Sequence, residues 1–173
     1  SVRSGLVFGS GSDGGPVIYF SDALAQVHAL NANDGTLLWR TDIGLFPTSV
    51  VTGTPALHDG RLYVPLSSYE AAMAGMPVYP CCRSHGAVVA LEAGSGAILW
   101  TAHTAPHATK QGKRASGVDK WGPSGVSIWS TPAIDAKRGL LYKYLSLDFP
   151  ETVSRLLRTH CPFYLEFWEA FLK

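Results

Sequence analysis

Apolar and polar residues alternate along two stretches of the chain that share one pattern. In residues 86–100, Val88 and Ala90, and later Ile98 and Trp100, alternate with their neighbours as in strands with one buried face. Glycine and serine at 94–96 separate the two runs and suit a tight hairpin turn. Residues 27–39 repeat this design in the same register. The pattern predicts two β-hairpins that each end in a tryptophan.

The two hairpins also match residue by residue. The matched positions are Ala29, Asn31, Asp34, Gly35 and Trp39 in the first hairpin, and Ala90, Glu92, Ser95, Gly96 and Trp100 in the second. One copy would be an ordinary hairpin, but two copies favour a repeat, which is typical of β-propeller blades. We expect each tryptophan to lie flat against the neighbouring blade and to have a purely structural role.

A second element occurs twice as well. Residues 54–57, a turn at 59–60 and a return strand over 61–64 correspond to residues 131–134 and a return strand over 139–142. An insertion from 65 to 85 and a polar, glycine-rich loop over 102–127 lie between these elements. The insertion explains why the two tryptophans are farther apart than the roughly 40–45 residues of a compact blade. Long loops between rigid strands commonly carry function.

The chain changes character after Tyr142. Residues 143–173 contain no glycine and no hairpin signal. Asp148 with Glu151, and Pro150 between them, suit a helix start, and aromatic residues recur at helical spacing from 163 to 172. We predict a helical tail. It is either a terminal helical hairpin packed on the sheets or a segment foreign to the repeat, through truncation or a shifted reading frame.

The composition supports the prediction from the pattern and excludes several classes of protein. The 173 residues include 18 glycines and 11 prolines, which favour the many turns of an all-β fold. A net charge of +1 gives no attraction to nucleic acid or anionic lipid. No apolar run is long enough to span a bilayer. The chain begins at Ser1 without a methionine or a signal peptide, so we expect a processed or partial sequence.

The cysteines and histidines lack the spacing of common metal motifs. There is no C-x-x-C or C-x-x-C-H, which argues against a zinc ribbon, a thioredoxin motif or an attached haem. If the adjacent Cys81 and Cys82 pair with each other, they close an eight-membered ring, a kind of disulfide that is more often functional than stabilising. The six histidines show no metal-ligand spacing and are expected in loops and on strand surfaces.

Residues 1–142 resemble the quinoprotein alcohol dehydrogenases, β-propellers that bind pyrroloquinoline quinone (PQQ). The likeness is greatest to their polyvinyl-alcohol dehydrogenase branch, through TGTPALHDGRLYVPLSSYE, YPCCRSHGAVVALEAGSGAILW and GPSGVSIWSTPAIDAKRGLLY. The hairpins that end in tryptophan match the family's tryptophan-docking motif. The resemblance implies PQQ and calcium as cofactors, an alcohol substrate, a cytochrome c-type electron acceptor and a periplasmic or secreted location.

The resemblance also assigns roles to polar residues. Glu70 matches the family's calcium-ligating glutamate, and Thr52, Ser67 and Ser68 match positions that hydrogen-bond the carboxylates of the cofactor. Calcium prefers oxygen ligands, and in this family it polarises the quinone carbonyl that accepts hydride. Without the motif, Glu70 would be an ordinary surface carboxylate.

Aromatic, basic and sulfur-containing residues complete the implied cofactor site. Trp129 matches the residue on which the planar cofactor stacks, although without this context it would be a core tryptophan. Arg3 lies near the position of an arginine that contacts PQQ. Cys81 and Cys82 are similar to the disulfide ring that covers PQQ in related enzymes, but occur at a different place in the sequence.

The resemblance ends where two essential parts of the family's site would follow. In the family, Gly-Thr-Gly-Asn comes after the strand that ends at Tyr142, its asparagine ligates calcium, and the catalytic aspartate comes later. This chain has Lys143-Tyr144-Leu145 instead, so no residue is assigned as the general base. The family propeller has about eight blades.

We therefore predict an all-β fragment of such a propeller, with about two to three blades of four-stranded antiparallel sheet in residues 1–142, a divergent tail over 143–173, and no activity alone. The alternative is a non-catalytic propeller repeat that serves as a scaffold or protein-interaction module.

Overall fold

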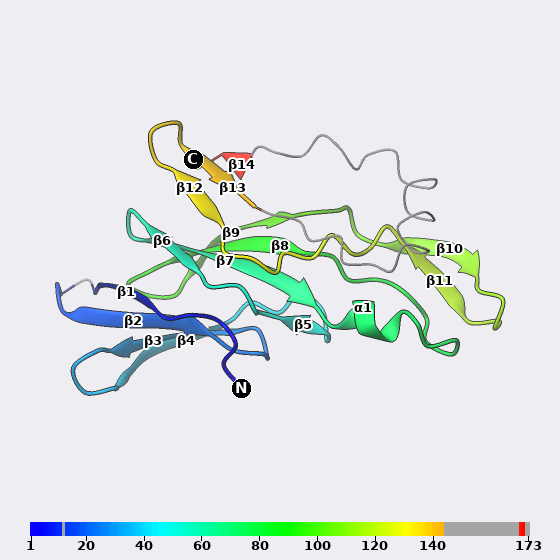
Figure 1. Ribbon diagram of the computed structural model, residues 1–173, viewed down its shortest axis with the longest axis horizontal. Coiled ribbons are helices and arrows are strands. Elements are labelled where there is room, and N and C mark those ends of the chain that lie inside the picture. The colour runs from blue at the N-terminus through cyan, green and yellow to red at the C-terminus, as the bar shows by residue number, and fades with distance from the viewer. Residues whose placement is uncertain (12, 144–169, 172–173) are drawn as a thin grey trace.

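The computed structural model describes residues 1–11, 13–143 and 170–171. These residues form antiparallel sheets that pack on one another, with one short helix among the described residues (Figure 1). The predicted all-β architecture of two blades and the start of a third is confirmed.

The first four strands form one antiparallel sheet, which we call blade 1. Its order is β1-β2-β3-β4. Along β3 the side chains of Val27 and Ala29 are buried while their neighbours are only partly so, which is the period of two that the sequence predicted. The bounds are β1 (Val7–Ser10), β2 (Pro16–Ser21), β3 (Gln26–Asn31) and β4 (Leu37–Asp42).

The next five strands form the second sheet, which we call blade 2. Its long central strand β7 pairs with β8 on one edge and with both β5 and β6 on the other. The bounds are β5 (Ser49–Val50), β6 (Ala56–His58), β7 (Arg61–Ser68), β8 (Ala87–Glu92) and β9 (Ile98–His103). In Figure 1 blade 1, in blue, lies beneath blade 2, in green.

Strand β7 is longer than predicted, because it continues through Pro65 to Ser68 rather than ending at Val64. On one edge β6 pairs with β7 as far as Tyr63, and β5 pairs with it from Ser67 onward. Pro65 lies between these two segments, where that edge of β7 pairs with no strand of the described residues. A proline is tolerated in a strand at such a place because no ladder hydrogen bond is lost there.

The polar stretch 102–127 also differs from the predicted loop. It contains a two-stranded ribbon of β10 (Thr109–Lys113) and β11 (Asp119–Gly122). Every residue of β10 is exposed, so neither face of that strand needs the apolar alternation that would have revealed it. Figure 1 shows the ribbon at one end of the molecule, beside the short helix.

The third sheet begins with the second copy of the repeated Thr-Pro-Ala element. It contains β12 (Ala133–Asp135), β13 (Leu140–Tyr142) and β14 (Ala170–Phe171). The predicted helical tail lies mostly outside the described residues. Of this tail only 143 and 170–171 are described, and 170–171 form a strand that pairs with β13 rather than part of a helix.

Two hydrophobic cores lie on opposite faces of blade 2. The first joins blade 1 to blade 2 and includes Tyr19 and Val27 with Leu62 and Leu91. The second lies between blade 2 and the third sheet and includes Tyr63, Ala90, Ile128 and Leu141. Blade 2 is therefore buried on both faces, and β8 accordingly reads as a continuous apolar run, Ala-Val-Val-Ala-Leu.

The two tryptophan hairpins have the same internal geometry. In each, the tryptophan faces an alanine across the ladder, and a register shift follows that alanine. The centroid of the tryptophan ring lies 5.9 Å from that of a tyrosine ring on the strand that pairs with the other edge of the alanine's strand. The residues are Trp39, Ala29 and Tyr19 in blade 1, and Trp100, Ala90 and Tyr63 in blade 2.

Trp39 also contacts the next blade, as the sequence predicted. Its indole Nε1 donates a hydrogen bond to the Ala93 carbonyl oxygen over 3.0 Å. A Cβ on Gly96 would lie 2.5 Å from Cε3 of the same ring, so only glycine leaves room for the indole there. The Thr41 hydroxyl donates to the Gly96 carbonyl oxygen over 2.7 Å. The end of β4 is thereby docked on the β8–β9 turn.

Candidate functional site

One irregular segment, residues 125–130, lies between the end of β7 and the start of β8. The Ile128 amide donates to the Leu66 carbonyl oxygen over 3.5 Å. The Gly125 amide donates to the Ser84 carbonyl oxygen over 2.8 Å. A Cβ on Gly86 would lie 2.3 Å from the Val126 carbonyl oxygen, so the backbones are in close contact. This arrangement brings the segment that carries Trp129 beside the end of β7, which carries Ser67 and Ser68, and beside the residues that follow Cys81 and Cys82.

The segment that carries Thr52 packs on the same region. A Cβ on Gly53 would lie 2.9 Å from the carbonyl carbon and oxygen of Ser130. The Thr52 Oγ1 atom is buried and has no hydrogen-bond partner among the described residues. A buried hydroxyl without a partner loses its hydration without compensation, so it marks a place where a polar ligand group could bind. Thr52 is the predicted cofactor residue whose hydroxyl is free for such a contact.

Ser67 and Ser68 are buried, but their hydroxyl groups already have protein partners. Ser67 Oγ donates to the Val50 carbonyl oxygen over 3.2 Å. Ser68 Oγ lies 2.7 Å from Thr48 Oγ1 and accepts a hydrogen bond from the Glu70 amide over 3.1 Å. These contacts fix β5 against β7 and place the start of the helix. Their predicted contacts with a cofactor stay a prediction.

Glu70 begins the single turn of helix α1 (Glu70–Met73) and is 4% exposed. Its carboxylate accepts hydrogen bonds from four donor groups. They are the Tyr79 hydroxyl at 3.0 Å, the Arg83 amide at 3.0 and 2.9 Å from the two oxygens, and the Ser84 amide and hydroxyl, each at 2.5 Å. A carboxylate offers about four lone-pair directions. The chain itself therefore satisfies Glu70, which holds the 79–84 loop on the helix.

These hydrogen bonds decide the charge of Glu70. Burial alone would raise the pKa of its carboxyl group, because desolvation disfavours the ionised form. The Ser84 hydroxyl, the amides of Arg83 and Ser84, and the Tyr79 hydroxyl outweigh burial and lower that pKa below its ordinary value. Glu70 is accordingly a buried carboxylate ion at neutral pH.

Cys81 and Cys82 form a disulfide with each other, in the loop that Glu70 holds. The peptide bond between them is cis. The loop pairs with the ribbon, since the Trp121 amide donates to the Cys81 carbonyl oxygen over 2.8 Å and the Cys82 amide donates back over 3.4 Å. The Arg83 guanidinium lies 3.9 Å above the centre of the Trp121 ring, a cation–π contact.

Two residues that the sequence analysis did not single out position this loop. Trp121 supports Cys81, Cys82 and Arg83, and its own Nε1 is buried without a hydrogen-bond partner in the described part of the chain. The Arg114 guanidinium donates to the carbonyl oxygens of Ala74, Met76 and Tyr79 over 2.9–3.1 Å. Both residues belong to the 109–122 region, which looked like a plain polar loop in the sequence. A tryptophan within an otherwise polar loop was the one available signal.

No contact between described residues joins Trp129 to Glu70 or to the 79–84 loop that carries Cys81 and Cys82. Trp129 is half-buried, and no ring contact joins it to another described residue. Arg3 is exposed, and the Gly5 amide holds its segment to Thr54 Oγ1 over 2.8 Å. The common cleft for a planar cofactor therefore stays a prediction.

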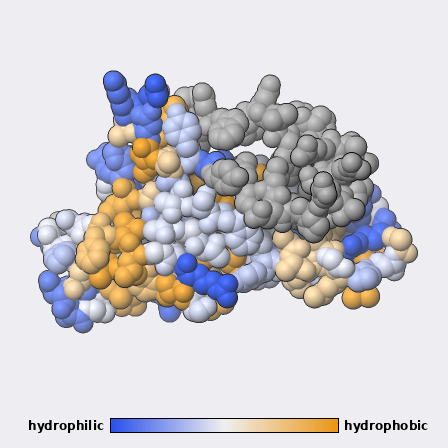
Figure 2. Space-filling model, viewed as in Figure 1, coloured by the Kyte–Doolittle hydropathy of each residue, from blue (hydrophilic) through white to orange (hydrophobic). Residues whose placement is uncertain are grey.

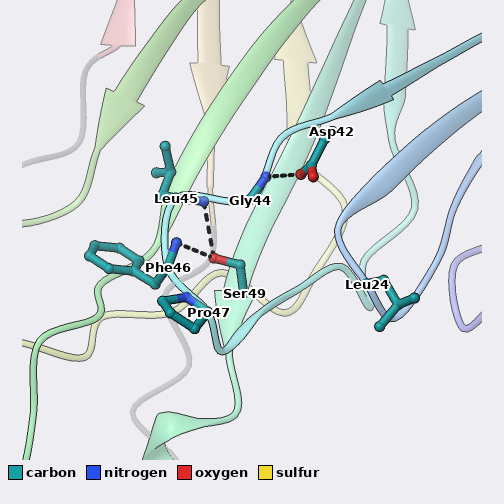
Figure 3. A pocket seen from close by; sticks show the side chains of 7 residues that line it. All are labelled: Leu24, Asp42, Gly44, Leu45, Phe46, Pro47 and Ser49. Atoms are coloured by element: carbon teal, nitrogen blue, oxygen red, sulfur yellow. Dashed lines mark hydrogen bonds between the residues drawn. The ribbon is translucent and has the colours of Figure 1, made fainter.

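A shallow pocket lies elsewhere, over the connection between β4 and β5 (Figure 3). Its polar atoms are used within the loop: Asp42 accepts from the Gly44 amide, and Ser49 Oγ accepts from the amides of Leu45 and Phe46. None of the predicted cofactor residues lines it. The lining residues are Leu24, Asp42, Gly44, Leu45, Phe46, Pro47 and Ser49.

The contacts described above leave a place for PQQ but not for calcium. The free Thr52 hydroxyl suits a ligand rich in oxygen atoms, as PQQ is. Calcium needs 6–8 oxygen ligands. The carboxylate oxygens of Glu70 already accept hydrogen bonds from the chain itself. In addition, no group of three or more His, Cys, Asp or Glu side chains in the described residues is arranged to hold a metal. In this arrangement the residues do not fit calcium.

Comparison with known proteins agrees with the fold and the repeat. The sequence model of the family described as "Outer membrane protein assembly factor BamB" matches residues 2–127. A polyvinylalcohol dehydrogenase of a Pseudomonas species is 43% identical over 137 residues, and one of a Sphingopyxis strain is 38% identical over 146 residues. The chain belongs to the family of that model, the PQQ-type β-propeller repeats, and is similar in sequence to the two polyvinylalcohol dehydrogenases.

The matches cover most of this chain but a small part of each relative. They cover 78% and 82% of this chain, and 21% and 22% of the two polyvinylalcohol dehydrogenases. Among solved structures, a europium-containing methanol dehydrogenase aligns with a TM-score of 0.54 at 20% identity, over 80% of this chain and 24% of that one. The quinohemoprotein alcohol dehydrogenase of Comamonas testosteroni aligns with a TM-score of 0.53 at 18% identity, over 73% and 19%. These likenesses show the propeller fold.

Proposed function

We propose that this chain is part of a PQQ-dependent alcohol dehydrogenase that acts on polyvinyl alcohol or a similar secondary alcohol. The observation that carries the proposal is the 43% identity to a polyvinylalcohol dehydrogenase over 137 residues, a stretch long enough to include most of blade 1, blade 2 and their insertion. The docked blades and the free Thr52 hydroxyl support it.

The chain's own residues have distinct roles in this proposal. Bound PQQ would supply the electron sink that accepts a hydride equivalent from the alcohol. Thr52 offers a hydrogen bond to a cofactor carboxylate, Arg3 a positive charge, and Trp129 a flat aromatic surface. The disulfide of Cys81 and Cys82 lies on a loop held rigid by Glu70 and Trp121.

The proposal also includes a calcium ion at Glu70, which requires existing hydrogen bonds to be replaced. The cation would have to replace the hydroxyl hydrogen bonds from Tyr79 and Ser84, because the carboxylate has no lone pair left for it. We therefore expect calcium to bind only together with ligands from further blades. The same reasoning predicts no alcohol turnover by this chain alone, since it has one carboxylate at the site and no assigned general base.

The partners and the cellular location follow the same proposal. Electrons would pass from the reduced cofactor to a cytochrome c-type acceptor, and two structural neighbours are quinohemoprotein alcohol dehydrogenases. A periplasmic or secreted location is supported by the disulfide, because such bonds persist in oxidising compartments. No described helix has the length and apolar character needed to cross a membrane.

A PQQ titration of the chain with a matched pair of variants tests this function. Tryptophan quenching should show weak, saturable binding, and no dye should be reduced when alcohols are added. Thr52→Val keeps the side-chain shape but removes the free hydroxyl. It should weaken PQQ binding by about 10–100-fold, as expected for a hydrogen bond to a charged group, without lowering stability. Thr109→Val, on the exposed ribbon, is the control and should bind like the wild type.

The scaffold alternative predicts a different outcome. The observation that favours it is Glu70, whose carboxylate is fully used within the chain. A scaffold would show no PQQ binding at any concentration and no effect of Thr52→Val. Sub-micromolar binding with turnover would instead show that the chain needs no further blades, contrary to our proposal.

A further inference from the structure

Each of the three sheets has two neighbouring cross-strand pairs of apolar residues, and successive residues of a strand point to opposite faces. One pair therefore faces the preceding sheet and the other faces the next sheet. The pairs that face the preceding sheet are Phe8–Ile18 in blade 1, Leu57–Leu62 in blade 2 and Ile134–Leu141 in the third sheet. The pairs that face the next sheet are Val7–Tyr19, Ala56–Tyr63 and Ala133–Tyr142.

Four of these six pairs meet in the two hydrophobic cores. The core between blades 1 and 2 contains Val7–Tyr19 and Leu57–Leu62, and the core between blade 2 and the third sheet contains Ala56–Tyr63 and Ile134–Leu141. In both cores the pair that contains a tyrosine packs against the aliphatic pair of the next sheet. The chain thus uses the same contact twice.

The other two pairs lie at opposite ends of the stack, since blade 1 and the third sheet lie on opposite sides of blade 2 (Figure 1). Phe8 is 68% exposed and Ile18 is only partly buried, whereas Leu62, in the place of Ile18, is fully buried. At the other end Ala133 is exposed and Tyr142 is 37% exposed. One end therefore presents a tyrosine pair, and the other presents the apolar pair that such a tyrosine contacts inside the chain.

We propose that these two ends bind each other between copies of the chain, with Ala133–Tyr142 of one copy packed on Phe8–Ile18 of a second copy. A second copy fits because it brings the same two partners that already meet in both cores. The net charge of +1 gives little repulsion between copies. Because the two surfaces differ, the contact is head to tail and can continue to further copies. It uses none of the predicted cofactor residues, so it is independent of the proposed dehydrogenase activity.

Sedimentation velocity of the full 173-residue chain tests this contact. The protein carries Cys161→Ser, so that no disulfide forms between copies. We expect reversible species that extend beyond a dimer, with a share that grows at micromolar concentrations and above. Phe8→Thr and Tyr142→Thr should each weaken this association by at least about 10-fold, because large aromatic side chains contribute most to such interfaces. Threonine suits a strand, and circular dichroism checks that each variant is folded.

Two further variants keep the test decisive. Ala133→Arg blocks the tyrosine end at an exposed position while leaving Tyr142 in place, and it should weaken association as well. Ile98→Thr is the matched control, because Ile98 is an exposed apolar residue on β9 of the middle sheet. It should associate like the wild type.

An equimolar mixture of Phe8→Thr and Tyr142→Thr tests the head-to-tail arrangement. The first variant keeps its tyrosine end and the second keeps its Phe8 end, so the mixture should form a one-to-one dimer that neither variant forms alone at the same concentration. Four results would overturn the proposal: a wild-type chain that stays monomeric, association that Tyr142→Thr and Ala133→Arg leave unchanged, as in a symmetric contact of two blade 1 faces, a mixture without the dimer, or an equal loss in Ile98→Thr.

Discussion

Gly35 and Gly96 occupy the same turn position in the two repeats, with φ angles of +77° and +74°. Around Gly35 no atom of the described residues lies within 4 Å of where a Cβ would be, whereas at Gly96 that Cβ would lie 2.5 Å from the Trp39 ring. The backbone of the turn is thus the same in both blades, but its surroundings are not. Glycine is needed at Gly35 for conformation alone, and at Gly96 for conformation and for the tryptophan above it.

The two tryptophans also differ, because in the described residues only the one in blade 1 donates a hydrogen bond to the following blade. The Trp39 indole donates to the Ala93 carbonyl oxygen, whereas the Trp100 indole makes no hydrogen bond to a residue in the described part of the chain. Each repeat therefore carries two halves of an interface, a tryptophan for one neighbour and a glycine turn for the other. Within the described residues only Trp39 and Gly96 complete such an interface. Hydrophobic residues also remain exposed on the blade 1 side, where Phe8 is 68% exposed and Figure 2 shows orange patches.

The largest expected difference between the blades concerns these glycines. Gly35→Ala should lower the free energy of unfolding by about 1–2 kcal/mol, because it forces a Cβ into a left-handed conformation. Gly96→Ala should add about 1–3 kcal/mol for overpacking against Trp39. Urea unfolding of both variants measures the difference. Equal losses would mean that Trp39 does not lie on the turn in solution.

A smaller effect is expected for the indole hydrogen bond. Trp39→Phe removes the bond to Ala93 and should cost about 1 kcal/mol more than Trp100→Phe, which removes none to the described chain. Both changes shrink a half-buried ring of the same kind, so Trp100→Phe corrects for the lost ring area. Thermal or urea unfolding of the pair gives the difference. A larger loss for Trp100→Phe would reverse the assignment of the docked and undocked blades.

The smallest expected effect is a pH dependence of the stability that the hairpin turn contributes, and it is expected in blade 2 alone. The Glu92 carboxylate accepts hydrogen bonds from the amides of Ser95 and Gly94, and the Ser95 side chain and amide, in that order, lower its pKa. A carboxyl group with a lowered pKa stabilises the fold above its ordinary pKa of about 4.3, and this contribution is lost as the pH falls through the folded value. Asn31 holds the same place in blade 1 and does not titrate.

Two variants isolate this effect. Glu92→Gln should reduce the loss of stability between about pH 5 and pH 3, and Asn31→Asp should increase it, because the new carboxylate would accept the Asn33 amide in the same way. Unfolding midpoints across this pH range measure both changes. An unchanged pH profile in Glu92→Gln would show that the carboxylate does not stabilise the turn.

The sequence was sufficient to predict strands and blade contacts where a motif was repeated or where one face of a strand was buried. The Trp39 docking followed from two copies of one motif, and the strands of blade 1 from alternation. The full length of β7 was missed because Pro65 is a strand breaker in most settings, and its place opposite a gap between β5 and β6 is a property of the tertiary structure. The ribbon was missed because β10 buries neither face.

The candidate site depended on information that local sequence does not contain. Glu70 and Thr52 were found through family resemblance, but nothing local showed that Glu70 would accept hydrogen bonds from a loop up to 14 residues away. The rings of His85, His103 and His107 lie together although they come from three segments, and the supporting Trp121 lies in a ribbon that sequence patterning did not reveal. Such contacts are determined by how the blades and insertions pack.

The contact between Trp39 and Gly96 is the most direct test of docked propeller blades in this chain. An NMR experiment with the wild-type protein would look for nuclear Overhauser effects between the indole protons of Trp39 and the α-protons of Gly96. We predict strong effects and an upfield ring-current shift at Gly96, with neither at Gly35, whose turn has no ring on it. Random-coil shifts at Gly96 without any Overhauser effect to Trp39 would contradict the docking, and with it the partial propeller.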